Sequence, residues 1–149
     1  MKKNILVSAC LLGEPTRYDG KSKPTAEVLS LRGKYNLVPV CPEVLGGLPT
    51  PRTPSERVGE RVIMRDGCDV TDNFHLGAQR ALDICKENNC KFAVLKARSP
   101  SCGKSEIYDG SFSGTLKEGD GVFAELLREE GVEIFSEEET EKLLTKSTL

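Results

Sequence analysis

The sequence predicts an α/β fold, a three-layer α/β/α sandwich of Rossmann-like type with a mostly parallel sheet. Short apolar runs alternate with helix-like segments along the 149 residues. The first two runs and the helix between them fall within residues 4–40, the spacing of a βαβ unit with parallel strands. The runs are continuously apolar, as in strands covered on both faces. The length suits a single domain over 1–149.

The first βαβ unit is expected as follows. Residues 4–9 (N-I-L-V-S-A) predict the first strand, which leads into Cys10 and a structured loop over 11–20. Residues 24–31 predict a short helix with Val28 and Leu29 inward and Gly33 as its stop. The apolar run at 35–40 predicts the second strand, best defined over 37–40, and it delivers Cys41.

Residues 41–52 read C-P-E-V-L-G-G-L-P-T-P-R and predict a rigid, non-repetitive loop. Pro42 lacks an N–H, so the strand is not expected to continue through it. Gly46 and Gly47 permit backbone conformations that other residues avoid. The loop would present Cys41 and Glu43, although Cys41 has an alternative reading as an ordinary buried cysteine ending a strand.

Residues 52–71 look polar and irregular, with a short strand over 60–64. The longest helix is expected to begin with Thr71 or Asp72 as its N-cap. Its apolar positions recur at helical spacing and predict a buried face: Phe74, Ala78, Ala81, Leu82 and Cys85. Cys85 is therefore expected in the core rather than in a redox pair with Cys90. His75 is expected to be a surface or packing residue rather than a base.

Residues 91–97 predict the third strand, which runs directly into a loop carrying Cys102. Residues 106–115 form either a hairpin or a mobile lid. A helix is expected over 122–130, with Gly131 as its stop and these residues inward: Val122, Phe123, Leu126 and Leu127. Residues 132–135 predict a fourth strand. Ser136 should cap a last helix over 137–144, and the tail 142–149 is expected to fray.

Composition excludes several classes of function. The net charge of −2 and the absence of Trp predict neither a nucleic-acid nor a membrane partner. The basic start, Met1-Lys2-Lys3, precedes only a short apolar run with no cleavage site, so we interpret it as the first strand of a cytoplasmic protein. In that compartment six cysteines favour metal binding or catalysis over disulfides. The sequence indicates no particular oligomeric state.

Three cysteines follow strands directly: Cys10, Cys41 and Cys102. Ligands of parallel sheets bind outside the carboxyl ends of the strands, so these thiols should converge. With no C-x-x-C and a single His, a zinc site is disfavoured. Three thiolates are one short of the usual four for a [4Fe–4S] cluster, which would leave one iron open as a Lewis acid that favours a soft sulfur ligand. Cys68 lies among acidic residues, which raise the pKa of a thiol, and is not expected to be a ligand.

Other side chains are expected around the thiols. Glu43 is a candidate acid/base, and Ser99 and Ser101 supply hydroxyls that are candidates for catalysis. The residues expected to contact substrate are Arg17, Tyr18, Arg52, Arg98 and Lys104. For each of these residues the alternative interpretation is that its side chain simply packs the loop or is solvated.

Five motifs, V-S-A-C-L-L-G, R-Y-D-G, C-P-E-V-x-G-G-L-x-x-P-R, G-x-D-V-T-x-x-F and L-K-x-x-S-P-S-C-G, together resemble the thiouracil desulfidases. That family was first catalogued as a bacterial domain of unknown function. The resemblance spans residues 4–132. It implies a [4Fe–4S] cluster held by Cys10, Cys41 and Cys102, with Glu43 as acid/base and Ser99 as a further catalytic residue.

The same resemblance implies the reaction. The open iron binds the sulfur of a small-molecule thiolated pyrimidine, a 4-thiouracil-like base, nucleoside or nucleotide. Water then replaces that sulfur, and sulfide is released without net redox change. An open cluster is expected to be lost from protein prepared in air.

Two other functions compete with this reading. A metal- or sulfur-carrier accessory protein would use the same cysteines without catalysis and would not need Glu43. A cysteine hydrolase would use Cys41 or Cys102 as nucleophile, but it needs a base, and His75 is the only imidazole in the chain.

Overall fold

The centre of the protein is a parallel sheet with the strand order β2-β1-β5-β8. The structure is a computed structural model and describes residues 2–145. The strands of the sheet are β1 (Lys3–Ser8), β2 (Tyr35–Val40), β5 (Phe92–Leu95) and β8 (Glu133–Ser136). Every pairing within this sheet is parallel, which confirms the predicted fold class.

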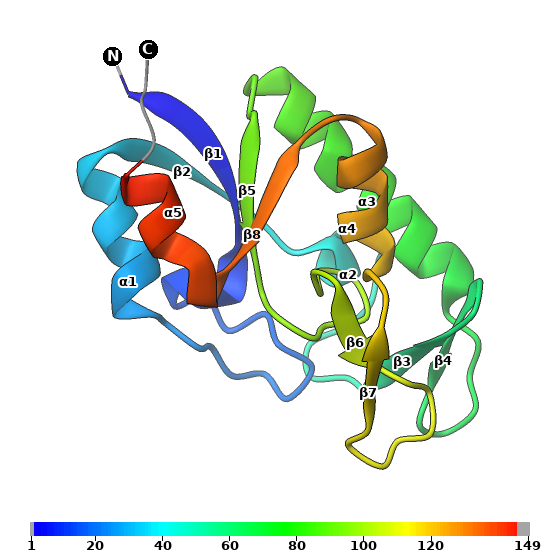
Figure 1. Cartoon of the computed structure of the whole chain (residues 1–149). Coiled ribbons are helices and arrows are strands. Elements are labelled where there is room, and N and C mark those ends of the chain that lie inside the picture. Colours follow the sequence, from blue (N-terminus) through cyan, green and yellow to red (C-terminus); the bar gives the residue numbers. More distant parts are fainter. Residues whose placement is uncertain (1, 146–149) are drawn as a thin grey trace.

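Helices cover both faces of the sheet (Figure 1). On one side lie α1 (Ala26–Leu29), the 3-10 turn η2 (Ser30–Gly33) and α5 (Thr140–Leu144). On the other lie α3 (Thr71–Glu87) and α4 (Val122–Glu129). Alternate strand residues separate into two apolar clusters, with Leu6 and Ala93 packed toward α3 and α4 and Val7 and Val94 toward α1 and α5. The three-layer sandwich is therefore confirmed.

The strand order reverses between β1 and β5. The chain passes from β1 to β2 through α1 on one face, then crosses to β5 through α3 on the other. Such a reversal leaves a crevice at the carboxyl ends of the two strands, where the flanking connections diverge. The 3-10 turn η1 (Ala9–Leu12) and the loop over 96–105 begin there.

Two antiparallel hairpins lie beyond this edge of the sheet (Figure 1). One pairs β3 (Ser55–Val58) with β4 (Arg61–Met64), and the other pairs β6 (Glu106–Tyr108) with β7 (Leu116–Glu118). The second hairpin confirms one of the two alternatives for 106–115. The irregular segment expected over 52–71 was wrong at residues 55–58, because the polar residues of β3 are buried against other parts of the chain rather than solvated. The short strand expected over 60–64 corresponds to β4.

Three local expectations are corrected. α2 (Pro42–Leu45) is one turn of helix rather than a non-repetitive loop, because Pro42 is at its first position, where no N–H is needed. The N-cap of α3 is Val70, and the Thr71 hydroxyl instead accepts the N–H of Val62 at 2.9 Å. In the first helical segment Leu31 is fully buried, whereas Leu29 is only half-buried.

The C-terminal segment packs against the rest of the chain. Ser136 forms a capping box, as predicted, but with the 3-10 turn η3 (Glu137–Glu139) that precedes α5. Leu143 is fully buried, and its carbonyl accepts a 2.9 Å hydrogen bond from the Tyr35 hydroxyl. α5 thus continues through 142 to Leu144, within the range 142–149 for which fraying is predicted, and residues 146–149 lie outside the described part. Among residues 2–145 no helix is long and apolar enough to cross a membrane.

Candidate active site

Three thiols from different strand ends line one cavity of about 450 Å³ at the switch point of the sheet. Cys10 belongs to η1 after β1, Cys41 links β2 to α2, and Cys102 lies in the loop after β5. All three are free, and Cys10 and Cys102 are buried. The structure thus brings together the three cysteines that the strand-end argument selected.

The three thiols are close enough to influence one another electrostatically. Burial, with a smaller contribution from Cys41, raises the pKa of the Cys10 thiol to about 11. Burial raises the pKa of Cys102 to about 12, against hydrogen bonds from Ser8 and Ser101 that lower it. Both groups are therefore protonated at neutral pH, and a bound cation would be needed to keep them as thiolates.

The cysteines of the cavity provide the donor atoms that iron–sulfur clusters use. Within the described residues 2–145, no group of three Cys, His, Asp or Glu side chains is arranged to hold one metal ion. The ligands of an iron–sulfur cluster bind separate iron atoms, so they need not converge on one point. Among its lining residues the cavity has three cysteines, two carboxylates and no imidazole, and cysteine sulfur is the usual ligand of such clusters.

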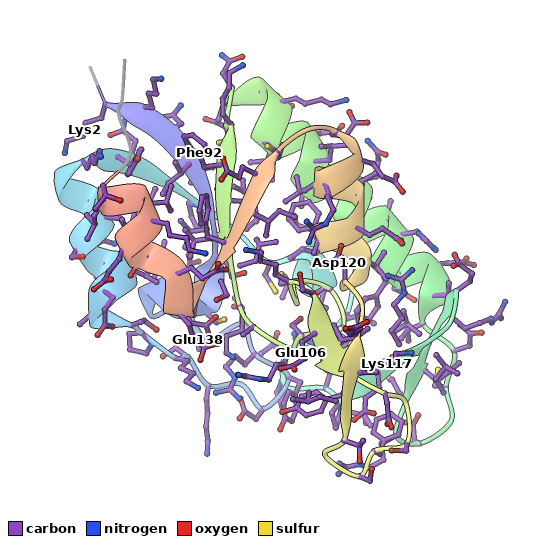
Figure 2. The ribbon with its side chains drawn as sticks, in the orientation of Figure 1. Lys2, Phe92, Glu106, Lys117, Asp120 and Glu138 are labelled. Atoms are coloured by element: carbon purple, nitrogen blue, oxygen red, sulfur yellow. The ribbon has the colours of Figure 1, made fainter. Side chains whose placement is uncertain are left out.

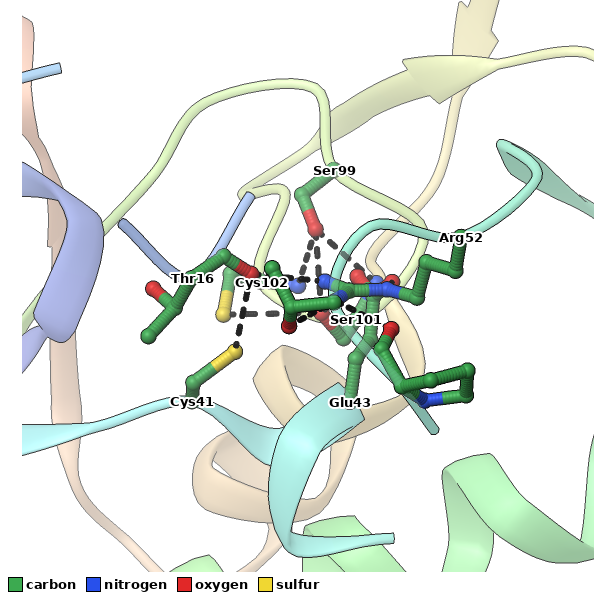
Figure 3. A network of polar contacts seen from close by, with 9 residues as sticks. Thr16, Cys41, Glu43, Arg52, Ser99, Ser101 and Cys102 are labelled. Atoms are coloured by element: carbon green, nitrogen blue, oxygen red, sulfur yellow. Dashed lines mark hydrogen bonds and ion pairs between the residues drawn. The ribbon is translucent and has the colours of Figure 1, made fainter. Parts of the chain in front are cut away.

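Glu43 lies beside the thiols in the first turn of α2 (Figure 3). Its Oε1 atom accepts a hydrogen bond from Arg52 Nε at 3.1 Å, and its Oε2 atom accepts one from Ser101 Oγ at 3.1 Å. The carboxylate side chain is 14% exposed. Glu43 is thus a half-buried carboxylate held from two sides, with access to the cavity.

Ser99 and Ser101 form a directional chain of hydroxyls that ends at Glu43 (Figure 3). Ser99 Oγ accepts the backbone N–H groups of Ser101 and Cys102, each at 3.1 Å. Its own proton is then available to Ser101 Oγ, 3.0 Å away, which in turn donates to Glu43. Each hydroxyl can give up its own proton as it accepts another, so the chain could pass a proton to or from Glu43.

The loop that carries these serines is fixed by the start of α4. The N–H of Val122 donates to the carbonyl of Pro100, and the N–H of Phe123 donates to that of Ser101, both at 2.8 Å. These helix N–H groups have no partner within α4, so the loop satisfies them while the helix positions the loop.

Arg52 ties its own loop to α2 and to the loop that contains Thr16. Besides Glu43, its guanidinium donates to the carbonyl of Thr16 at 2.9 Å and to the carbonyl of Pro49 at 3.2 Å. Its side chain is only 3% exposed. The structure therefore presents Arg52 mainly as the buried counter-ion of Glu43, although it also lines the cavity.

The other predicted substrate contacts divide into two groups. Arg17 and Tyr18 line the cavity, and so does Arg98, whose guanidinium pairs with Glu106 and Glu138 at 3.5 Å each; both carboxylates are labelled in Figure 2. The structure does not bring Lys104 to this cavity.

Lys104 instead pairs with Glu139 at 2.8 Å and lies over the ring of Phe135. Its position two residues after Cys102 suggested a place in the site. The chain turns away after Gly103, where a Cβ would meet Ile107 Cγ2 at 2.7 Å, and the lysine follows the new direction.

Sequence reasoning missed several residues that line the cavity: Ser8, Lys96, Glu56, Arg65, Tyr108 and Phe112. Lys96 carried a detectable signal, because it is the last charged residue of the third predicted strand, 91–97, which leads into the serine loop. Glu56 and Arg65 carried a weaker one. Gly59-Glu60 separates two short similar runs, S-E-R-V and R-V-I-M, which is a hairpin pattern.

Fold and cavity together define a Rossmann-like α/β protein with three cysteines, a carboxylate and two serines around one sheet-edge cavity. The chain belongs to the 2-thiouracil desulfurase family, whose model matches residues 5–139. This finding confirms the resemblance that the motifs indicated, and the family is one of sulfur-removing enzymes.

Two relatives illustrate the similarity. The chain is 39% identical over 150 residues to the uncharacterized protein YbbK of Bacillus subtilis (strain 168), covering 94% of this chain and 99% of that protein. It also resembles the solved structure of TudS, described as a [4Fe-4S]-dependent thiouracil desulfidase. The TM-score is 0.90 and the identity 47%, with 96% of each chain covered.

Proposed function

We propose that this protein catalyses an iron–sulfur-dependent, non-redox desulfidation of a thiolated pyrimidine, such as a 4-thiouracil-like base, nucleoside or nucleotide. The observation that carries the proposal is the meeting of three free cysteines and the Glu43–Ser101 pair at one cavity. The likeness to TudS, described as a [4Fe-4S]-dependent thiouracil desulfidase, supports the same cofactor and substrate class.

Cys10, Cys41 and Cys102 would hold the [4Fe–4S] cluster as thiolates. When bound, the cluster supplies an iron atom without a protein ligand, which acts as a Lewis acid toward the sulfur of the substrate. Cations of the cavity, among them Arg17 and Lys96, lower the pKa of Cys10 against the effect of burial and would favour its thiolate form.

Glu43 would act as the base that takes a proton from the attacking water. The water oxygen forms a bond to the ring carbon, and the carbon–sulfur bond breaks with its electron pair remaining on sulfur. The ring gains a carbonyl group, and hydrogen sulfide leaves, so no atom is oxidised or reduced. Ser101 and Ser99 hold the carboxylate and relay protons, and Arg52 fixes its orientation.

The structure favours this proposal over a cysteine hydrolase. His75 is exposed on α3 and is not among the residues that line the cavity. A carrier protein remains the second candidate, since it would use the same three thiols, and only the role of Glu43 separates the two. We further propose that the reaction takes place in the cytoplasm, where free cysteines persist.

The test is to measure iron and acid-labile sulfide per chain after anaerobic reconstitution, for the parent and for Cys102→Ser. We expect about four of each in the parent, loss in the variant, and sulfide release from 4-thiouracil or its nucleotide by the parent alone. Protein exposed to air should lose its iron. Absence of iron from the reconstituted parent would refute the proposal.

A further inference from the structure

The outer wall of the cavity is built by the two hairpins rather than by the sheet. The β3–β4 hairpin and the residues flanking it contribute Pro54, Ser55, Glu56 and Arg65 to the cavity lining. The β6–β7 hairpin and its connecting loop contribute Tyr108, Phe112 and Gly114. Neither hairpin carries a cysteine that lines the cavity, so this wall is free to contact the part of a substrate away from its sulfur.

A buried carboxylate joins the two hairpins. Glu56 is only 8% exposed, and its Oε1 atom accepts the backbone N–H groups of Gly110 at 2.9 Å and Phe112 at 3.1 Å. At Gly110 the loop packs so closely on β3 that a Cβ would come within 2.6 Å of Val58 Cγ2. Glu56 therefore fixes the tip of the second hairpin, residues 109–115, against the first.

Phe112 is held in an unusual position by these contacts. Its φ is 55°, in the left-handed region that residues with a bulky side chain rarely adopt. The guanidinium of Arg65 lies 5.6 Å from its ring centroid, so a cation supports the aromatic ring. The aromatic residues Tyr18 and Tyr108 also line the cavity, but they are 42% and 37% exposed. Phe112 is half-buried, and both Glu56 and Arg65 hold it in place.

We propose that Phe112 is the surface on which the pyrimidine ring of the substrate stacks, and that Glu56 is a positioning residue that places it there. The inference rests on the proposed function and adds a residue that sets affinity for the ring. A thiolated pyrimidine is flat and aromatic, so an offset stack on a fixed phenyl ring gives affinity without involving the sulfur. Stacking acts equally on substrate and transition state, so it should alter KM more than kcat.

The first test compares Phe112→Leu and Phe112→Tyr with the parent, each loaded with cluster and assayed with 4-thiouracil. Phe112→Leu should raise KM about two- to ten-fold, the range expected for loss of one aromatic stack, and change kcat less than about two-fold. Phe112→Tyr should have the same KM as the parent, because it keeps the aromatic ring. Iron content should be the same in all three proteins.

The second test is a double-mutant cycle with Glu56→Ala. If Glu56 acts through Phe112, the single variants and the Glu56→Ala/Phe112→Leu double variant should show nearly the same KM. In Glu56→Ala the amide protons of Gly110 and Phe112 should exchange faster with solvent. Glu125→Gln is the matched control. Glu125 lies on α4 and accepts a 2.9 Å hydrogen bond from Arg57, the neighbour of Glu56 in β3. The variant therefore removes a carboxylate bound to the same strand but not to the loop 109–115. It should leave KM and both exchange rates unchanged.

An unchanged KM in Phe112→Leu, or fully additive effects in the cycle, would overturn the inference. Binding of 4-thiouracil to the loaded proteins, measured by calorimetry, separates this failure from failure of the proposed function. If the parent binds the base but releases no sulfide, the desulfidase proposal fails, and the ratio of Kd between Phe112→Leu and parent still decides the stacking. If the parent does not bind the base, both proposals fail.

Discussion

Glu43 is the residue on which the interpretation of the site depends most. The motif C-P-E identified it, because a carboxylate two residues after a strand-end cysteine must lie near the thiol. Its partners could not be identified in the same way. Arg52 is predicted to contact substrate, and nothing in the sequence indicates that it is also the buried counter-ion of Glu43. Its position depends on the carbonyl of Thr16, 36 residues away in the chain.

Glu43→Gln separates an enzyme from a carrier. The amide keeps the shape of the side chain and an acceptor for Arg52, but it is not a base at neutral pH. We expect iron and labile sulfide to stay at the parent level while sulfide release from 4-thiouracil falls by a factor of about 100 or more. Turnover equal to the parent would remove the catalytic role of Glu43 and favour the carrier.

At the scale of elements, the strands were predictable and the small connections were not. The sheet strands are continuous apolar runs, so the sequence locates each one within a few residues. β3 is a buried strand with polar residues, and its burial depends on Glu56 bonding to a loop more than fifty positions later. α2 depends on a close contact with α3 that no local pattern records.

That contact gives a prediction. A Cβ at Gly77 of α3 would overlap the carbonyl oxygen of Pro42, so Gly77→Ala should push α2 and Glu43 away from the site. We expect a loss of about 1–3 kcal/mol in the free energy of unfolding, measured with urea, together with reduced turnover. Gly33→Ala is the control, because a Cβ there meets no heavy atom within 4 Å. Equal stability of the two variants would argue against the packing described.

The junction of η3 and α5 predicts a dependence on pH. Burial raises the pKa of Glu139, but hydrogen bonds from Lys104, Lys142 and the Ser136 N–H outweigh it and hold the pKa at about 2, below the ordinary 4.5. A depressed folded-state pKa stabilises the fold above the unfolded-state pKa, and this stabilisation is lost as pH falls toward 2.

Glu139→Gln should therefore be less stable than the parent near neutral pH, by on the order of 1–3 kcal/mol. The difference should shrink steadily between about pH 5 and about pH 2. Urea midpoints of both proteins across this range provide the measurement. A difference that stays constant down to the lowest pH would assign the effect to packing instead of ionisation.

At the scale of the whole molecule, the place of the site followed from topology alone. Cys10, Cys41 and Cys102 are far apart in sequence, and the rule that parallel strands carry their ligands at their carboxyl ends was enough to group them. The outer wall of the cavity could not be located in this way, because no comparable rule gives the position of hairpins that lie beyond the sheet. Their docking depends on single long-range contacts, such as Glu56 with Gly110.

The same topology predicts that the cofactor stabilises the entire fold. The three cysteines belong to the ends of β1, β2 and β5, adjacent strands of one sheet, so a cluster bound to all three would cross-link its centre. A group that binds the folded chain and not the unfolded one raises stability by mass action. We expect anaerobic reconstitution to raise Tm by at least about 5 °C, equivalent to roughly 2 kcal/mol for a chain of this size.

Chelation of the iron should return Tm to the value of the metal-free protein. Anaerobic reconstitution should raise the Tm of Cys102→Ser much less than that of the parent. It should raise the Tm of Cys68→Ser as much as that of the parent, because Cys68 is exposed and does not line the cavity. Calorimetry under nitrogen gives all of these values. If loading left Tm unchanged while iron stayed bound, the metal would have to be held by fewer than three strand ends, and the assignment of the ligands would be wrong.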